Sequence, residues 1–120
     1  MGKITLEGLE FFAYHGFHAE EQIIGNKYAV DILVEADVSE AAHSDRLSKT
    51  IDYGKLYKAI ETEMQQPSKL LEHIAYRISR SLLDKFEIIM AVEVSVSKYN
   101  PPIGGICQRA KITIRETRDS

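Results

Sequence analysis

Residues 52–86 read DYGKLYKAIETEMQQPSKLLEHIAYRISRSLLDKF and separate two segments that have a different hydrophobic period. In this stretch the apolar side chains recur every three to four residues, which is the spacing of one face of an α-helix. Two helices are predicted, one from an Asp52 cap to a stop at Pro67, and one from a Ser68 cap to the end of the stretch. Their apolar stripes consist of Leu56, Ile60 and Met64 in the first helix and of Leu71, Ile74, Ala75, Ile78 and Leu82 in the second.

On both sides of this stretch apolar residues alternate with polar ones, a period typical of β-strands that are buried on one face. Two strands are predicted before the helices, over 4–14 with a bulge at Gly8 and over 28–38. Two more follow, over 90–99 and 106–116. The side chains that share an apolar face are Tyr28, Val30, Ile32, Val34, Ala36 and Val38 in the second strand, Met90, Val92, Val94 and Val96 in the third, and Ala110, Ile112 and Ile114 in the fourth.

The resulting order is β-β-α-α-β-β. It predicts an α+β fold with a four-stranded antiparallel sheet and both helices on its apolar face. A ferredoxin-like arrangement would need two strands between the helices, and residues 66–69 leave no room for them. The connections are polar at 17–27, with room for one helical turn, and at 39–50. The connection at 100–105 is predicted to be irregular because its two prolines cannot join a central ladder.

The opposite face of the predicted sheet is polar and has two interpretations. It can be exposed to solvent, or it can line a lumen formed when the sheets of several subunits close into a ring and remove each other's edges. Periodicity alone favours solvent exposure. The side chains on this face are Asp31, Glu35, Glu93, Ser95, Lys111, Thr113 and Arg115.

Length and composition limit the class of protein. The 120 residues, with 44% hydrophobic and 28% charged side chains, predict one globular domain over 1–120. The net charge of -3 provides no cationic excess for nucleic acid, and no apolar run reaches the ~18 residues of a membrane span. A single cysteine, Cys107, and the lack of a signal-peptide pattern favour the cytoplasm.

Four short motifs lie where predicted elements end, and such positions present side chains to sites. Taken singly, each motif has a structural explanation: Glu72 suits the first turn of a helix, and Lys98 can be a solvated charge at a strand end. The motifs are Tyr14-His15-Gly16 with the nearby Glu20, Glu21 and Gly25; Ile51-Asp52-Tyr53-Gly54; Leu70-Leu71-Glu72-His73; and VSKYNPPI at 96–103.

Together the motifs resemble those of the dihydroneopterin aldolase family, in the family's order and spacing, over residues 6–114. The match comprises F-x-x-Y-H-G at 11–16, D-Y-G at 52–54, L-L-E-H at 70–73 and K-x-N-P-P at 98–102. The resemblance implies the tunnelling fold (T-fold), in which four subunits close their sheets into a barrel and two such rings stack as an octamer. It therefore favours the lumen interpretation of the polar face.

The resemblance also implies an enzymatic activity. The family cleaves 7,8-dihydroneopterin into 6-hydroxymethyl-7,8-dihydropterin and glycolaldehyde in folate biosynthesis, with an accompanying C2′ epimerase activity. Other aldolases make the electron sink of a retro-aldol reaction with a lysine Schiff base or a metal. The C6=N5 imine of a dihydropterin is itself a sink, so no cofactor is expected. His15 and His18 share a loop without an obvious third metal ligand, and His15 is expected to fix the turn.

Five residues occupy the family's site positions. Glu72 and the Leu71 backbone would anchor the pterin, with the carboxylate accepting hydrogen bonds from its 2-amino group and N3–H. Lys98 would take the proton of the side-chain hydroxyl, which requires a neutral amine in desolvated or cationic surroundings. Tyr53, from a neighbouring subunit, would return a proton to the enamine. Glu21 would contact the substrate beside the lysine.

Some departures and alternatives remain open. Asn26 stands where the family frequently has glutamine, and residues 103–105 are Ile-Gly-Gly where a second proline often follows the isoleucine. Glu20 could take the role of its neighbour if the loop shifts by one residue. One alternative function is an epimerase acting on dihydroneopterin triphosphate. Its substrate needs a cationic pocket, and Arg109 and Lys111 are the basic residues that keep this alternative open. The other is a non-catalytic pterin-binding ring protein.

Overall fold

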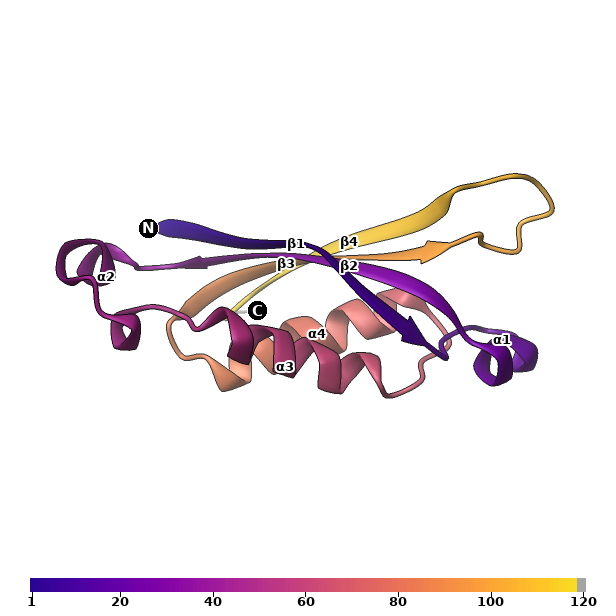
Figure 1. The fold of residues 1–120 in the computed structure, drawn as a ribbon, viewed down its shortest axis with the longest axis horizontal. Helices are drawn as coiled ribbons and strands as arrows, with labels where there is room; N and C mark the ends of the chain where they lie inside the picture. Colours follow the sequence, from indigo (N-terminus) through magenta and orange to yellow (C-terminus); the bar gives the residue numbers. More distant parts are fainter. Residues whose placement is uncertain (119–120) are drawn as a thin grey trace.

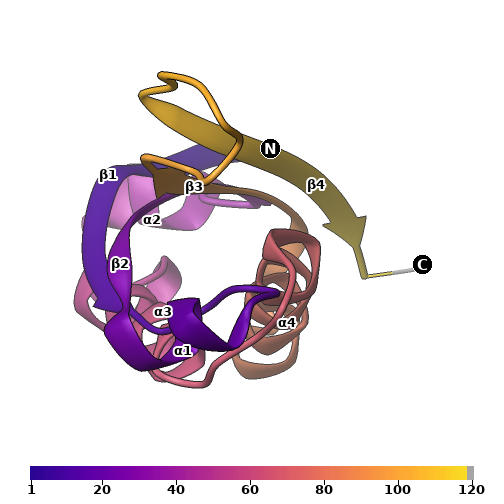
Figure 2. The ribbon, with the colours of Figure 1, turned by 90° about the vertical axis from the view of Figure 1, so that its right-hand side faces the viewer.

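The computed structural model describes residues 1–118 and contains one antiparallel sheet in the strand order β1-β2-β3-β4 (Figure 1). The strands are β1 (Gly2–Ala13), β2 (Asn26–Ala36), β3 (Ile89–Tyr99) and β4 (Arg109–Thr117). The two long helices, α3 (Tyr53–Met64) and α4 (Leu71–Lys85), lie on the same side of this sheet (Figures 1 and 2). The predicted α+β architecture is therefore confirmed.

The core lies between the two helices and the apolar face of the sheet. Alternation along the central strands turns every second side chain toward the helices, and the stripes of α3 and α4 face the strands. Removing this surface from water is the main driving force of folding, at about 25 cal/mol per Å². The fully buried residues include Val30, Ile32 and Val34 of β2, Val92, Val94 and Val96 of β3, and Leu56, Ile60, Ile74, Ile78 and Leu82 of the helices.

Two bulges shape the sheet. The predicted bulge in β1 is confirmed, because its register with β2 shifts between residues 6 and 9 and Gly8 has a φ of 69°. A second bulge lies at the start of β3, where Met90 is the extra residue between Ile89 and Ala91. Both neighbours of Met90 are buried, whereas Met90 itself is 42% exposed. The prediction that Met90 faces the core is therefore wrong.

The starts of the two long helices are built differently. At α3 the predicted cap is confirmed, because Oδ1 of Asp52 accepts a hydrogen bond from the Gly54 N–H at 2.8 Å. At α4 the predicted Ser68 cap is wrong. The cap position is Leu70, and Ser68 is buried with its hydroxyl turned to the side chains of other residues. No side chain of the described chain caps α4.

The connections contain short helical segments. α1 (Ala19–Ile24) lies in the first polar connection, and α2 (Ser39–Ser44) and the 3₁₀ turn η1 (Leu47–Lys49) lie in the second. The sequence pattern predicts α1 as a helical turn but predicts neither α2 nor η1. β4 begins at Arg109, so the prediction that residues 106–108 form its first part is wrong.

The face of the sheet away from the helices is polar, as predicted. On it Arg115 forms an ion pair with Glu35, and the hydroxyl oxygens of Ser95 and Thr113 lie 2.7 Å apart. β1 and β4 are the edge strands of the sheet. Edge strands are the elements on which another chain can add a further strand.

The molecule is elongated, with a longest dimension of 52 Å. α1, the start of α4 and the loop between β3 and β4 lie at one end, which we name the α1 end (Figure 1). α2 lies at the other end, and α3 begins on the α2 side of the molecule (Figure 1). None of the helices within residues 1–118 has both the length and the apolar character needed to cross a membrane.

Candidate active site

Lys98 and Glu21 form an ion pair at the α1 end. Lys98 is the next-to-last residue of β3, and Glu21 is in the first turn of α1. Nζ of Lys98 lies 2.6 Å from Oε2 of Glu21, and only 13% and 20% of the two side chains are exposed. This distance is that of a strong, charge-assisted hydrogen bond. The structure therefore brings together two of the residues that the resemblance places in the site.

The turn before α1 fits closely around Glu21. Oε1 of Glu21 accepts a hydrogen bond from the His18 N–H at 3.2 Å, and the Gln22 side chain donates to the Gly16 carbonyl at 2.9 Å. Gly16 has a φ of 153°, and a Cβ at this position would lie 2.4 Å from Cβ of Glu21. Only glycine leaves room here for the Glu21 side chain to lie against the turn.

The site is desolvated and its carboxylate is charged. Burial raises the pKa of the Glu21 carboxyl, but hydrogen bonds from the Lys98 ammonium and the His18 N–H outweigh burial and hold that pKa below its usual range. Glu21 is therefore an anion at neutral pH. The surroundings of Lys98 are withdrawn from water, as a base requires, but its ion-pair partner is anionic rather than cationic.

His15 ties the same turn to the rest of the fold. Its side chain is 1% exposed, Nδ1 accepts a hydrogen bond from the Ser68 N–H at 3.0 Å, and its carbonyl accepts one from the Tyr28 hydroxyl at 2.6 Å. Burial and, to a lesser degree, the charge of Arg77 lower the pKa of His15 to about 4. The Met64 carbonyl opposes this lowering, although Nε2 makes no hydrogen bond of standard geometry within residues 1–118. His15 is thus a neutral acceptor at pH 7.

Leu71 and Glu72 form the first turn of α4, at the same end of the molecule as the ion pair (Figure 1). Glu72 is exposed, and Leu71 is partly buried. No side chain of the described chain caps this helix, and its backbone bonding begins with the His73 N–H, which donates to the Leu70 carbonyl at 3.2 Å. The Leu71 and Glu72 N–H groups precede these bonds, and the helix dipole adds positive potential around them. A carboxylate beside such N–H donors can bind a planar ring whose edge carries both donors and an acceptor.

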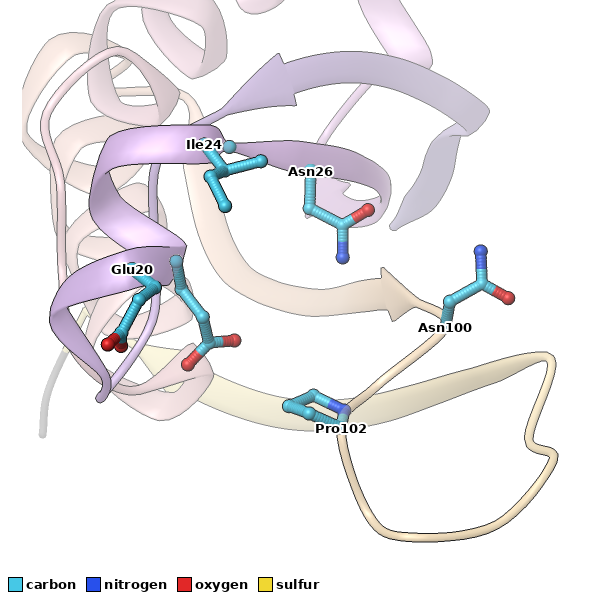
Figure 3. Close-up of a pocket in the computed structure, with 7 residues that line it drawn as sticks. Glu20, Ile24, Asn26, Asn100 and Pro102 are labelled. Atoms are coloured by element: carbon cyan, nitrogen blue, oxygen red, sulfur yellow. The ribbon is translucent and has the colours of Figure 1, made fainter.

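A pocket of about 200 Å³ opens beside the ion pair, lined by residues of α1, the start of β2 and the loop after β3 (Figure 3). Glu20 and Glu21 both line it, but within the described chain Glu21 is the one that pairs with Lys98. Nδ2 of Asn26 donates to the Tyr99 carbonyl at 2.7 Å. The asparagine therefore ties the start of β2 to the end of β3 at the rim of the pocket.

Tyr53 lies away from the α1 end, on the α2 side of the molecule (Figure 1). It is the first residue of α3 and is 61% exposed. The hollow beside this helix start is lined by Asp52 and by Lys85 of the last turn of α4, whereas Glu72 is in the first turn of α4. A single chain therefore does not bring Tyr53 to Lys98.

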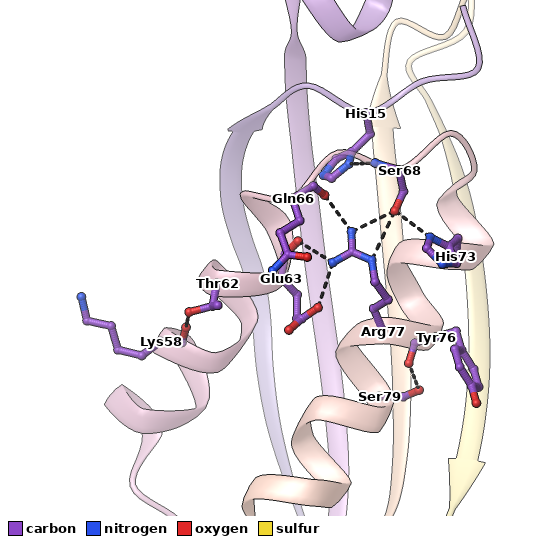
Figure 4. A network of polar contacts seen from close by, with 10 residues as sticks. All are labelled: His15, Lys58, Thr62, Glu63, Gln66, Ser68, His73, Tyr76, Arg77 and Ser79. Carbon is purple, nitrogen blue, oxygen red and sulfur yellow. Dashed lines mark hydrogen bonds and ion pairs between the residues drawn. The ribbon is translucent and has the colours of Figure 1, made fainter.

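Arg77 is a residue near the site that the sequence reasoning missed. It lies in the middle of α4 and donates to Ser68, to the Glu63 carbonyl in the last turn of α3 and to the Gln66 carbonyl in the connection (Figure 4). An arginine beside the apolar stripe of a helix is usually a surface charge, so the sequence contains no signal that singles it out. Within residues 1–118, His, Cys, Asp and Glu side chains form no group of three that could hold a metal ion.

The sheet order β1-β2-β3-β4, with the helix pair between β2 and β3 on one face, is the architecture of the T-fold class of proteins. Within that class the family is shown by sequence: the family model for dihydroneopterin aldolase matches residues 4–115, and the chain belongs to this family of aldolases. The dihydroneopterin aldolase of Bacillus subtilis is 38% identical over 115 residues, which cover 95% of this chain and 96% of the relative. The predicted family and enzyme class are confirmed.

Solved structures of relatives have the same fold. The Escherichia coli dihydroneopterin aldolase in complex with neopterin is similar with a TM-score of 0.89 at 22% identity, over 97% of this chain and 99% of the other. The dihydroneopterin aldolase of Burkholderia thailandensis bound to guanine has a TM-score of 0.78 at 17% identity, over 98% and 92% of the two chains. The predicted T-fold is confirmed, while closure of the sheets into a barrel across subunits stays a prediction.

Proposed function

We propose that this protein cleaves 7,8-dihydroneopterin into 6-hydroxymethyl-7,8-dihydropterin and glycolaldehyde. The observation that carries the proposal is the ion pair of Lys98 and Glu21, which is withdrawn from water and lies at the same end of the molecule as Glu72 in the uncapped first turn of α4. The first group can exchange protons with a substrate, and the second can hold a pterin ring. Membership of the aldolase family supports the proposal.

Glu72 and the Leu71 N–H hold the pterin ring in this proposal. The carboxylate accepts hydrogen bonds from the 2-amino group and N3–H, while the backbone N–H donates to the ring carbonyl. Guanine presents the same edge of amino group, ring N–H and carbonyl, and neopterin contains the complete pterin. Neopterin and guanine are the ligands bound in the two solved relatives. The two ligands are therefore suitable probes for this protein.

The reaction breaks the C1′–C2′ bond of the substrate side chain. The C2′ hydroxyl gives up its proton, its oxygen becomes the carbonyl oxygen of glycolaldehyde, and the electron pair of the broken bond moves through C6 to N5. Protonation of the resulting enamine at C1′ then gives the hydroxymethyl product, so one proton is lost and one is gained. Because the substrate imine accepts the electrons, Lys98 does not need to form a Schiff base.

The base in this scheme is the ion pair taken as a unit. In the ion pair a single proton lies between Nζ of Lys98 and Oε2 of Glu21, and it can reside on either partner. Low dielectric disfavours separated charges, so entry of the substrate into the site favours transfer of the shared proton from Lys98 to Glu21. The neutral amine that remains can take the C2′ proton. Glu21 then has a direct part in proton transfer in addition to contacting the substrate.

Tyr53 of a neighbouring chain completes the site and protonates C1′. Edge-to-edge joining of the sheets through β1 and β4 would close a ring, in which no strand edge remains exposed. We propose a ring of four chains and a stack of two rings. Re-addition of glycolaldehyde through its other face, before it leaves the site, would give the C2′ epimer, so epimerase activity should accompany cleavage.

An assay in the presence of EDTA tests the proposed reaction. Purified protein is mixed with 7,8-dihydroneopterin, and glycolaldehyde is measured. We expect turnover in EDTA, a fall in kcat of roughly 10²–10⁴ in Lys98→Ala, and an unchanged kcat in Lys58→Ala, which removes an exposed lysine from α3. A wild type that releases no glycolaldehyde contradicts the proposal. Activity that EDTA abolishes and zinc restores would assign the chemistry to a metal instead.

A further inference from the structure

Arg77 uses all five of its N–H donors within the chain (Figure 4). Nη1 donates to the carbonyl of Glu63 at 2.9 Å and to its Oε1 at 2.8 Å, and Nη2 donates to the Gln66 carbonyl at 2.7 Å. Nη2 and Nε both donate to Oγ of Ser68, at 2.9 and 3.3 Å. One planar guanidinium therefore fixes the last turn of α3 and the connection that leads into α4.

The backbone of Ser68 links Arg77 to the turn before α1. The Ser68 N–H donates to Nδ1 of His15 at 3.0 Å, and the Ser68 carbonyl accepts a hydrogen bond from the Gly16 N–H at 2.9 Å. Burial and the charge of Arg77 hold the pKa of His15 at about 4, so Nδ1 remains an acceptor at neutral pH. Gly16 in turn lies against the side chain of Glu21.

The hydroxyl of Ser68 links Arg77 to the first turn of α4. Because Oγ of Ser68 accepts from the guanidinium, its own proton is available to Nδ1 of His73, which lies 2.8 Å away. His73 is the residue after Glu72. Ser68 and Arg77 thus connect the turn that contains the proposed pterin anchor to the turn that holds Glu21.

We infer that Arg77 is a positioning residue, which through Ser68 holds Glu72 in a fixed relation to the Lys98–Glu21 pair. Glu72, the pterin anchor, and the Lys98–Glu21 pair are the two halves of the site in the proposed function, on which this inference rests. A ligand that contacts both halves at once depends on their relative placement, because small misplacements are costly for groups that must act together. A ligand that contacts the anchor alone does not depend on it.

Neopterin and guanine distinguish these two kinds of ligand. Neopterin has a side chain that can reach the Lys98–Glu21 pair, whereas guanine has only the edge that the anchor would bind. Arg77→Lys keeps the charge but cannot make five hydrogen bonds in one plane. We expect it to raise the Kd of neopterin about tenfold and that of guanine by less than about threefold. Calorimetric titration of the full-length protein measures both, with circular dichroism establishing that the variant is folded.

Two further variants control the experiment. Arg80→Lys is the matched control, because Arg80 lies one turn later on α4 and makes a looser ion pair with Glu116, at 3.7 Å. We expect both Kd values to stay at the wild-type level in this variant. Ser68→Ala removes the hydroxyl but keeps the two backbone hydrogen bonds. It should show the same selective loss of neopterin binding. This variant therefore tests the inference even if Arg77→Lys does not fold.

The outcomes separate this inference from the proposed function. Selective weakening of neopterin in the folded variants supports the positioning role. If the Kd values of both ligands rise equally, or neither rises, the positioning role is overturned. Binding of neopterin by the wild type would in that case still leave the proposed function standing. A wild type that binds neither ligand removes the proposed function and the positioning role with it.

Discussion

At the scale of single residues, the proposed site combines two carboxylates in opposite environments. Glu21 is largely buried and paired with Lys98, whereas Glu72 is exposed and makes no ion pair within the described chain. Removing a partner from a buried pair leaves an uncompensated charge, which destabilises the fold. Removing an exposed carboxylate does not. Substitution of Glu21 should therefore lower the stability of the fold, whereas substitution of Glu72 should weaken ligand binding.

Glu72→Ala should abolish tight pterin binding in a protein that remains folded. Loss of one charged partner of a buried hydrogen-bonded pair costs about 2–5 kcal/mol, which corresponds to a rise in Kd of roughly 30-fold to several thousand-fold. Calorimetry with neopterin measures the effect. Asp84→Ala, which removes an exposed carboxylate near the other end of α4, is the control. A Kd for Glu72→Ala within a few-fold of the wild type would show that Glu72 is not the anchor.

The buried His15 predicts a loss of stability in mild acid. Its pKa is about 4 in the folded protein, against 6.5 for an unperturbed histidine. Between these values the unfolded chain binds more protons than the folded one, so the free energy of unfolding falls as the pH falls. The part due to His15 is about 2 kcal/mol between pH 7.5 and 5. Urea unfolding at one protein concentration should show this fall in the free energy of unfolding in the wild type and not in His15→Gln. Equal pH dependence of the two proteins would refute the contribution of His15.

At the scale of helices and strands, the long elements with a sustained period are the ones that the sequence predicts. β2 has eleven residues and alternates in burial from Val30 to its end, and α4 keeps its stripe over fifteen residues. α2 has six residues and η1 three, too few to show a period. The error at Met90 has another cause. A bulge shifts the register by one residue and turns the side chain to the other face, and the alternation of apolar residues contains no sign of it.

The residues of the candidate site divide in the same way. The positions of Lys98, Glu21 and Glu72 follow from the resemblance to the motifs of the family, and their roles are proposals. Ser68 and Arg77 could not be predicted, because a serine before a helix is an ordinary cap and an arginine on a helix is an ordinary surface charge. Their contacts arise only when the connection between α3 and α4 folds against the turn before α1, which local sequence patterns do not report.

The turn before α1 gives a prediction at the same scale. Gly16→Ala should displace Glu21 from Lys98, since the new Cβ would lie 2.4 Å from Cβ and 2.7 Å from Oε1 of Glu21. We expect kcat to fall at least about tenfold. Gly8→Ala is the matched control, because Gly8 also has a positive φ, of 69°, but a Cβ there meets nothing within 4 Å. It should lower stability and leave kcat unchanged; equal kcat losses in the two variants would contradict the account.

At the scale of the whole molecule, each chain holds the parts of the proposed site in two separate places. Lys98, Glu21 and Glu72 are at the α1 end, and Tyr53 begins α3 on the α2 side of the molecule. The edge strands β1 and β4 can each accept a strand of another chain. A closed ring would pair every edge and could bring Tyr53 of one chain to Lys98 of the next.

The central claim is that cleavage takes place at a site shared by two chains, and complementation tests it most directly. Tyr53→Phe and Lys98→Ala are produced together with different affinity tags, and mixed rings are isolated by two affinity steps and verified by native mass spectrometry. With random assembly, about a quarter of the interfaces combine an intact Tyr53 with an intact Lys98. We predict release of glycolaldehyde from 7,8-dihydroneopterin at about that fraction of the wild-type rate, well above either variant alone. No recovery in verified mixed rings would contradict the shared site and the role of Tyr53.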